Sequence, residues 1–169
     1  MGMFLAPINV AVETAALGIY APSNLFVIAN QDVTNSTTFT DSTNLQVSLI
    51  AGATYDFQTM ELIGASSFAT SGAKSVLAYT GTATFYGQRR RNGASNVEPI
   101  NISATWGGSG EAVNGTAVES TKSLIVERFG RIVTTTAGTL KIQFAQNTAI
   151  SGHYARLLVG SFLKVQRVS

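Results

Sequence analysis

The stretch TLKIQFAQN, residues 139–147, decides the fold class, because it is the most regular part of the chain. Leu140, Ile142 and Phe144 take every second position, with a lysine and a glutamine between them. Successive side chains of a β-strand point to opposite faces. The stretch therefore predicts a strand with one buried face and one face that tolerates water.

The same alternation occurs earlier in the chain. Leu45, Val47 and Leu49 alternate with polar residues, Gly52 follows, and large residues again take every second place at the start of 54–62. We interpret these two runs as a hairpin. The other strand-length segments are rich in β-branched or aromatic residues and comprise 76–79, 82–88, 100–105, 124–133, 139–147, 154–159 and 161–168.

Turn residues separate these segments every eight to twelve positions or so, and no long helical pattern competes with them. The sequence predicts an all-β protein, an antiparallel jelly-roll sandwich or barrel of about 8 strands with an extended N-terminal arm. A chain of 169 residues has room for one core. We expect residues 1–30 to form the arm and residues 31–169 to form a single β-sandwich domain.

The first thirty residues are apolar but lack the clean alternation that follows. An apolar arm has to be covered, so we expect it to pack along a neighbouring subunit or a partner surface. The alternative is that residues 24–29 form the first strand of the barrel. The arm residues that we predict to bind a partner are large and apolar, namely Met3, Phe4, Leu5, Leu17, Ile19 and Tyr20.

Charged residues make up only 12% of the chain, about half the usual fraction. A surface with so few repelling charges promotes association, which favours controlled self-assembly. The absence of cysteine excludes disulfides, thiolate nucleophiles and Cys-ligated zinc. Glu13, Pro7 and Pro22 interrupt the apolar N-terminus and no Lys or Arg precedes it, so we expect neither a signal peptide nor a membrane helix.

Catalytic chemistry finds little support in the residues. His153 is the only histidine, and no Gly-x-Ser-x-Gly turn accompanies it, so we interpret it as a turn residue at the start of a strand. The nine carboxylates are scattered singly, and the odd offset between Asp56 and Glu61 places them on opposite faces of a strand. No calcium-loop or phosphate-loop pattern is complete. We predict no catalytic, cofactor or metal site, and therefore no enzyme.

The main charge cluster is Arg89, Arg90 and Arg91, followed by the turn dipeptide Asn92-Gly93. Three guanidinium groups at a loop tip could bind carboxylates of a partner or a polyanion. The alternative is that they are simply solvated. Without further clustered Lys or Arg they make a poor nucleic-acid groove, so we include them among the partner-binding residues and expect no nucleic acid.

Two parts of the chain resemble a known group of proteins. VTNSTT at 33–38, followed by NLQVSLIAGATYDF at 44–57, resembles the opening hairpin of small β-domains in structural proteins of tailed bacteriophages. AGTLKIQFAQNT at 137–148, followed by LVGSFLKV at 158–165, is similar to the C-terminal end of that group. These motifs are structural, and they transfer no active site.

The resemblance implies a virion protein similar to trimeric capsid decoration (cement) proteins, head fibres and tail-fibre tips. The leading expectation is a homotrimer on the capsid surface that binds the major capsid protein, with no cofactor and no membrane. The alternative is a receptor-binding tip domain of a phage head or tail fibre, which would bind host glycans through loops around Arg90 and Trp106. A depolymerase or other hydrolase ranks last.

Overall fold

The computed structural model describes residues 13–14, 19–20, 22–68, 70–93, 96–98, 106–107, 113–115 and 124–169, with side chains in 22–68, 70–90 and 124–169. Every regular element in these ranges is a β-strand, and every pairing is antiparallel. The prediction of an all-β antiparallel fold is confirmed.

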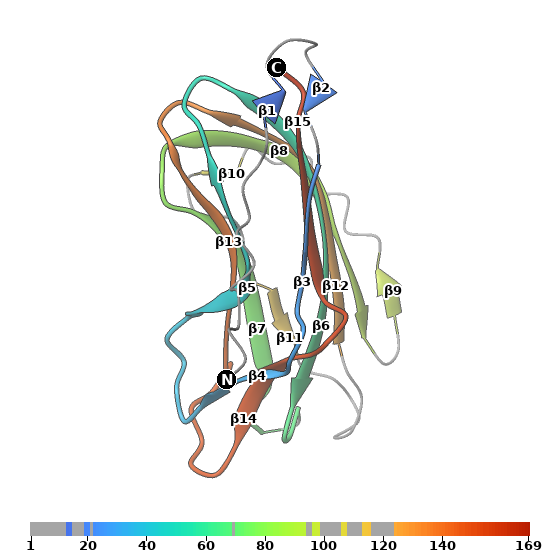
Figure 1. The fold of residues 1–169 in the computed structure, drawn as a ribbon. Helices are drawn as coiled ribbons and strands as arrows, with labels where there is room; N and C mark the ends of the chain where they lie inside the picture. The colour runs from blue at the N-terminus through green and yellow to red at the C-terminus, as the bar shows by residue number, and fades with distance from the viewer. Residues whose placement is uncertain are drawn as a thin grey trace, which may run out of the picture.

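The strands form two facing layers, which Figure 1 shows edge-on. The larger sheet contains β3 (Ser23–Phe26), β4 (Gln31–Thr34), β6 (Thr54–Ala65), β8 (Ala83–Gly93), β9 (Asn96–Glu98), β10 (Trp106–Gly107), β12 (Leu124–Thr134), β14 (Tyr154–Leu157) and β15 (Phe162–Arg167). The smaller sheet contains β5 (Thr40–Leu49), β7 (Ala73–Tyr79), β11 (Val113–Gly115) and β13 (Gly138–Ala145). The short strands β1 (Glu13–Thr14) and β2 (Ile19–Tyr20) pair with each other.

The pairing is nested around the middle of the chain. β3 and β4 pair with β15 and β14, β5 pairs with β13, β6 with β12, and β7 with β11. This first-with-last order, with successive strands alternating between the two sheets, is the jelly-roll arrangement. Counting β3 with β4 and β14 with β15 as single strands gives the eight strands of the roll. β8 adds a further strand beside β12.

Both strands at one edge of the larger sheet are interrupted at the same level. Residues 27–30 separate β3 from β4, and residues 158–161 separate β14 from β15. The two interruptions are bonded to each other, since the Val27 amide donates to the Ser161 carbonyl at 2.9 Å and the Gly160 amide donates to the Val27 carbonyl at 3.3 Å. We call residues 27–30 and 158–161 the double bulge. Gly160 has a φ of +91°, a backbone conformation that glycine adopts without steric cost.

The predicted hairpin between the runs at 45–49 and 54–62 is wrong. β5 and β6 are both strands, but they lie in different sheets and do not pair with each other. The turn between them carries the chain across the sandwich. The buried Thr134 holds this turn, because the Gly52 amide donates to the Thr134 carbonyl at 2.9 Å and the Ala53 amide donates to its hydroxyl at 3.1 Å.

The last part of the predicted arm belongs to the sandwich. β3 pairs with β15, and the Leu25 and Val27 side chains are buried in the core. The alternative, in which residues 24–29 supply the first strand, therefore describes Ser23–Phe26 correctly. Of residues 1–22, all except 13–14, 19–20 and 22 lie outside the described residues, as does the predicted strand at 100–105.

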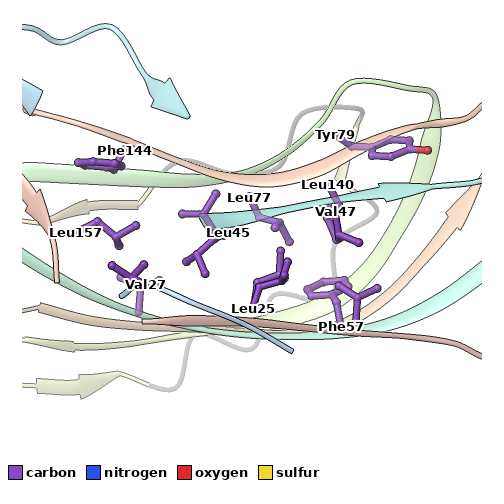
Figure 2. Close-up of a cluster of buried hydrophobic side chains, with 14 of the residues drawn as sticks. Leu25, Val27, Leu45, Val47, Phe57, Leu77, Tyr79, Leu140, Phe144 and Leu157 are labelled. Carbon is purple, nitrogen blue, oxygen red and sulfur yellow. The ribbon is translucent and has the colours of Figure 1, made fainter. Parts of the chain in front are cut away.

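The core lies between the sheets and is built by the predicted alternation. Figure 2 shows the labelled side chains of the two layers meeting, and those that come from the larger sheet and the double bulge are Leu25, Val27, Phe57 and Leu157. Those contributed by the smaller sheet are Leu45, Val47, Leu77, Tyr79, Leu140 and Phe144. Each fully buried aliphatic or aromatic side chain stabilises the fold by about 1.5–3 kcal/mol relative to an exposed one.

One polar cluster interrupts this apolar interior. The Glu61 carboxylate is fully buried and forms an ion pair with the buried Arg128 of the neighbouring strand β12. It also accepts hydrogen bonds from the Thr59 hydroxyl at 2.9 Å and from the Ser75 hydroxyl of the facing sheet at 2.5 Å. Arg128 in turn donates to the Ser75 carbonyl at 3.1 Å. The cluster therefore joins the two sheets through charge-assisted hydrogen bonds.

Removing one partner of this pair leaves a buried charge uncompensated. We expect Arg128→Met alone or Glu61→Leu alone to lower the free energy of unfolding by about 3–5 kcal/mol. The double variant should lose clearly less than the sum of the two, because it buries no lone charge. Urea unfolding of the four proteins measures this coupling, and strictly additive losses would contradict the described pair.

Two glycines allow β8 and β12 to approach closely. Gly87 and Gly130 are cross-strand partners, and a Cβ at Gly130 would overlap the Tyr86 carbonyl oxygen, while a Cβ at Gly87 would lie 2.6 Å from the Phe129 carbonyl oxygen. Backbone atoms on the facing strand cannot move aside as a side-chain tip can.

We therefore expect Gly130→Ala to destabilise the protein by about 1–3 kcal/mol through overpacking. Gly64→Ala is the matched control, because Gly64 also lies in a strand of the larger sheet and its added Cβ would meet only ordinary contacts at 3.8 Å. The control should be neutral or slightly stabilising, since alanine loses less backbone entropy on folding. Thermal unfolding of both variants measures the difference, and equal melting temperatures would contradict the described close approach of β8 and β12.

Candidate assembly surface on the larger sheet

The outward face of the larger sheet carries aromatic and apolar side chains at one edge. Phe26, Phe162, Met60, Glu127 and Arg90 are successive cross-strand partners, so they form one row across β3, β15, β6, β12 and β8. Neighbouring side chains in such a row lie about 4.5–5.5 Å apart at Cβ. The row is apolar at the β3 edge and charged at the β8 end.

The apolar end of the row continues into the double bulge. Phe26 is 50% exposed, Ile28 is 74% exposed and Val159 is 52% exposed. The Phe26 and Phe162 rings lie 6.2 Å apart, a favourable tilted aromatic pair. We call Phe26, Ile28, Val159 and Phe162 the outer patch. Single exposed apolar residues are common on protein surfaces, whereas several at one sheet edge make this surface a candidate for an interaction.

A lysine borders the outer patch. The Lys164 ammonium lies 5.0 Å from the centre of the Phe162 ring, in a cation–π arrangement. Its cross-strand partners are the uncharged Asn24 and Gln58. The patch therefore combines apolar surface with one exposed positive charge, which suits an apolar partner surface that carries a carboxylate.

Two ion pairs lie elsewhere on this face. Arg131 donates two hydrogen bonds to Asp56, at 2.7 and 3.0 Å, and the hydrogen bond to Asp56 raises the pKa of Arg131. Arg156 forms a similar two-bond pair with Asp32, which raises the pKa of Arg156. These surface pairs join directly opposite cross-strand partners and contribute little to stability.

The outward face of the smaller sheet is polar on β5 and β13. Gln46 and Ser48 are exposed on β5, and Lys141 and Gln143 of β13 lie beside them. Asp41 accepts hydrogen bonds from the Lys141 ammonium at 2.7 Å and from the Gln143 amide at 2.6 Å, and the bond from Lys141 lowers the pKa of Asp41. On β7 the strand alternation directs Val76 and Ala78 to this same face, and both are buried, so the polar surface is confined to β5 and β13.

The arginine cluster is not at a loop tip. β8 runs through it to Gly93 and continues as a hairpin with β9, so the predicted turn at Asn92-Gly93 is wrong. Arg89 is buried on the inner face of the strand, while Arg90 is exposed on the outer face and lies 5.3 Å from the Phe129 ring. Because strand residues alternate, Arg89 and Arg90 cannot present one joint anion-binding surface.

The structure describes the backbone of Arg91 but not its side chain. It is the cross-strand partner of Val126 on one side and of Glu98 on the other. The predicted partner-binding residues Met3, Phe4, Leu5 and Leu17 lie outside the described residues. Ile19 and Tyr20 form β2, and their side chains are likewise outside the described part.

Arg90 and Trp106, which were predicted to lie in glycan-binding loops, both lie in strands. Trp106 belongs to β10 and is the cross-strand partner of Phe85, five positions before Arg90 on β8. At about 3.3 Å per residue this separation is about 16 Å along the strand. Arg90 lies in the middle of a sheet face, so it does not belong to a loop beside Trp106.

His153 occupies the predicted turn position directly before β14. Its Nδ1 lies 3.3 Å from the Ser71 hydroxyl oxygen, but that hydroxyl donates to the Ser67 carbonyl at 2.8 Å. The proton of Ser71 is therefore directed away from the imidazole. Among the described residues, no three His, Cys, Asp or Glu side chains gather closely enough to hold a metal ion. The described part of the chain also holds no helix long and apolar enough to span a membrane.

Two features of the site were missed from the sequence, although signals for them exist. The run Leu25-Phe26-Val27-Ile28 is apolar at four successive positions, so both faces of that strand must be apolar. Phe162 stands among the polar residues of an otherwise regular alternation in β15. Both signals mark an outward apolar side chain, but neither says which strands bring them together.

The contrast between Leu25 and Phe26 tests this assignment. Leu25 is 4% exposed and Phe26 is 50% exposed, although they are adjacent in β3. We expect Leu25→Ser to lower the free energy of unfolding by about 2–5 kcal/mol and Phe26→Ser by about 1 kcal/mol or less, measured by urea unfolding at low protein concentration. A large loss for Phe26→Ser in dilute solution would make it a folding residue and not an assembly residue.

Comparison with protein-family models finds no matching family, and comparison with curated proteins finds no match. The resemblance to structural proteins of tailed phages therefore stays a prediction. The fold and the outer patch, by contrast, are observed in the structure.

Proposed function

We propose that this chain is a non-enzymatic structural protein of an assembled particle, namely a decoration protein on the capsid surface of a tailed-phage virion. In this role it forms a homotrimer, as the sequence resemblance implies, and binds the lattice of the major capsid protein. The resemblance supplies the virion context. The jelly-roll fold agrees with this context, since jelly rolls are frequent in viral capsid proteins, but a fold alone assigns no function.

The observation that carries the proposal is the outer patch. Phe26, Ile28 and Val159 expose half or more of their side chains on a protein with few charges to keep it apart from others. An apolar group rimmed by polar residues and one lysine has the composition of a protein-binding surface. Exposed aromatic side chains are frequent energetic centres of such surfaces.

A lattice also makes modest contacts sufficient. Each decoration protein that touches neighbouring capsomers buries surface only on the assembled shell, so its binding stabilises the shell and not the free subunits. Three copies of one patch in a trimer would bind together, and the second and third contacts become intramolecular. A small apolar patch on each subunit is therefore enough.

The test is reconstitution on purified particles that lack the protein. We expect saturable binding of the wild-type chain with a copy number comparable to that of the major shell protein, measured by quantitative mass spectrometry. The double variant Phe26→Ser/Ile28→Ser should bind at least about tenfold more weakly, because it removes the exposed apolar contact. Gln46→Ser/Ser48→Ala is the matched control on the other outer face and should bind as the wild type does.

The opposite results are equally specific. A handful of copies per particle would place the chain on a tail or fibre, and binding to a glycan array would then support the receptor-binding alternative. Unchanged binding of the Phe26→Ser/Ile28→Ser variant would remove the outer patch from the docking surface. Turnover of a capsule polysaccharide would make the chain an enzyme.

A further inference from the structure

We infer that two copies of this chain pair in solution through the outward face of the larger sheet, with Lys164 of each copy bound to Glu127 of the other. The inference goes beyond the proposed function, because it concerns the free protein and not the particle. A contact of this kind is two-fold and therefore separate from the contacts that would close a trimer.

The outward face carries two opposite charges that no described side chain neutralises. Lys164 is exposed, and its ammonium lies 5.0 Å from the centre of the Phe162 ring and in no ion pair. Glu127 is half-buried and has a cation as its cross-strand neighbour, Arg90. The Arg90 guanidinium nevertheless lies over the Phe129 ring, at 5.3 Å, and forms no ion pair with Glu127. One ammonium and one carboxylate are therefore left to bind a partner.

The two charges occupy opposite corners around the central strand β6. Lys164 is the cross-strand partner of Gln58, and Glu127 is the cross-strand partner of Met60. The charges thus lie two strands apart and are offset by two residues along the strands. Strands about 4.8 Å apart and a rise of about 3.3 Å per residue place the two Cα atoms about 12 Å from each other.

This arrangement is complementary to itself. In a two-fold contact residue i of one copy meets residue j of the other, and residue j of the first meets residue i of the second. A two-fold axis that passes between Gln58 and Met60 exchanges the two corners, so both Lys164–Glu127 pairs form at once. A second copy carries the same two charges at the same separation, whereas any other protein would need a carboxylate and a cation that happen to match.

Apolar side chains surround the two charges. Met60 and Phe162 are adjacent on the same row and partly buried, and Phe26 at the end of that row is 50% exposed. Covering them with a second copy removes apolar area from water, and a chain with only 12% charged residues offers little repulsion against it. Within the proposed function, a second copy and the shell would compete for the outer patch.

Charge reversal tests the contact. In sedimentation of the full chain over a concentration series, the mass of the smallest unit, one chain or one trimer, should double. Lys164→Glu and Glu127→Lys should each weaken this association at least about tenfold, because each places like charges opposite each other. Gln46→Glu/Ser48→Glu is the matched control: it makes the same net-charge change as Lys164→Glu on the opposite outer face and should associate as the wild type does.

Rescue separates a direct contact from a general loss of folding. An equimolar mixture of the Lys164→Glu chain and the Glu127→Lys chain should associate about as strongly as the wild type, since both contacts again join opposite charges. The doubly reversed chain Lys164→Glu/Glu127→Lys should recover for the same reason. A loss that neither the mixture nor the double variant restores overturns the inference, as does a wild type with the same mass as both single variants at every concentration.

The two proposals fail differently. Loss and rescue of pairing without any binding to particles would refute the decoration role alone. Binding to particles, with self-association that the reversals leave unchanged, would refute the two-fold pairing alone.

Discussion

The ion pair between Glu61 and Arg128 is the buried polar contact that joins the two layers of the sandwich. Apolar contacts have no preferred direction, whereas the buried carboxylate needs the hydroxyl groups of Thr59 and Ser75 at fixed positions. Thr59 lies in the same sheet as Glu61, and Ser75 lies in the facing sheet. We propose that the cluster favours one relative placement of the sheets.

Because the two sheets face each other, their outer faces lie on opposite sides of the molecule. The β5 and β13 face shows amides, hydroxyls and the Lys141–Asp41 pair to water. The opposite face shows the outer patch beside Lys164. The two outer surfaces therefore differ in chemistry: the surface formed by β5 and β13 is polar, whereas the surface at the outer patch is apolar.

Much of the fold could be predicted from the sequence because alternation reports directly on faces. Leu140, Ile142 and Phe144 are all buried, and Glu61 and Asp56 lie on opposite faces as their odd offset requires. Pairing could not be predicted in the same way, since alternation in β5 and β6 is compatible with a hairpin and with a crossing between sheets. The arginine cluster was misplaced for a related reason: turn-forming residues such as Asn92 and Gly93 are tolerated inside a strand when the partner strands hold it. The outer patch joins residues more than 130 positions apart in the chain, and no local signal reports such proximity.

The double bulge places four residues of one strand opposite four residues of its neighbour, 158–161 beside 27–30. Because the two interruptions are equally long, the strands on either side keep a common register. A single insertion in one of them would shift β4 against β14 or β3 against β15, and a shift of one residue turns every side chain to the other face. Related sequences should therefore lengthen or shorten the two segments together, so that the segment lengths covary across more than a hundred positions of chain.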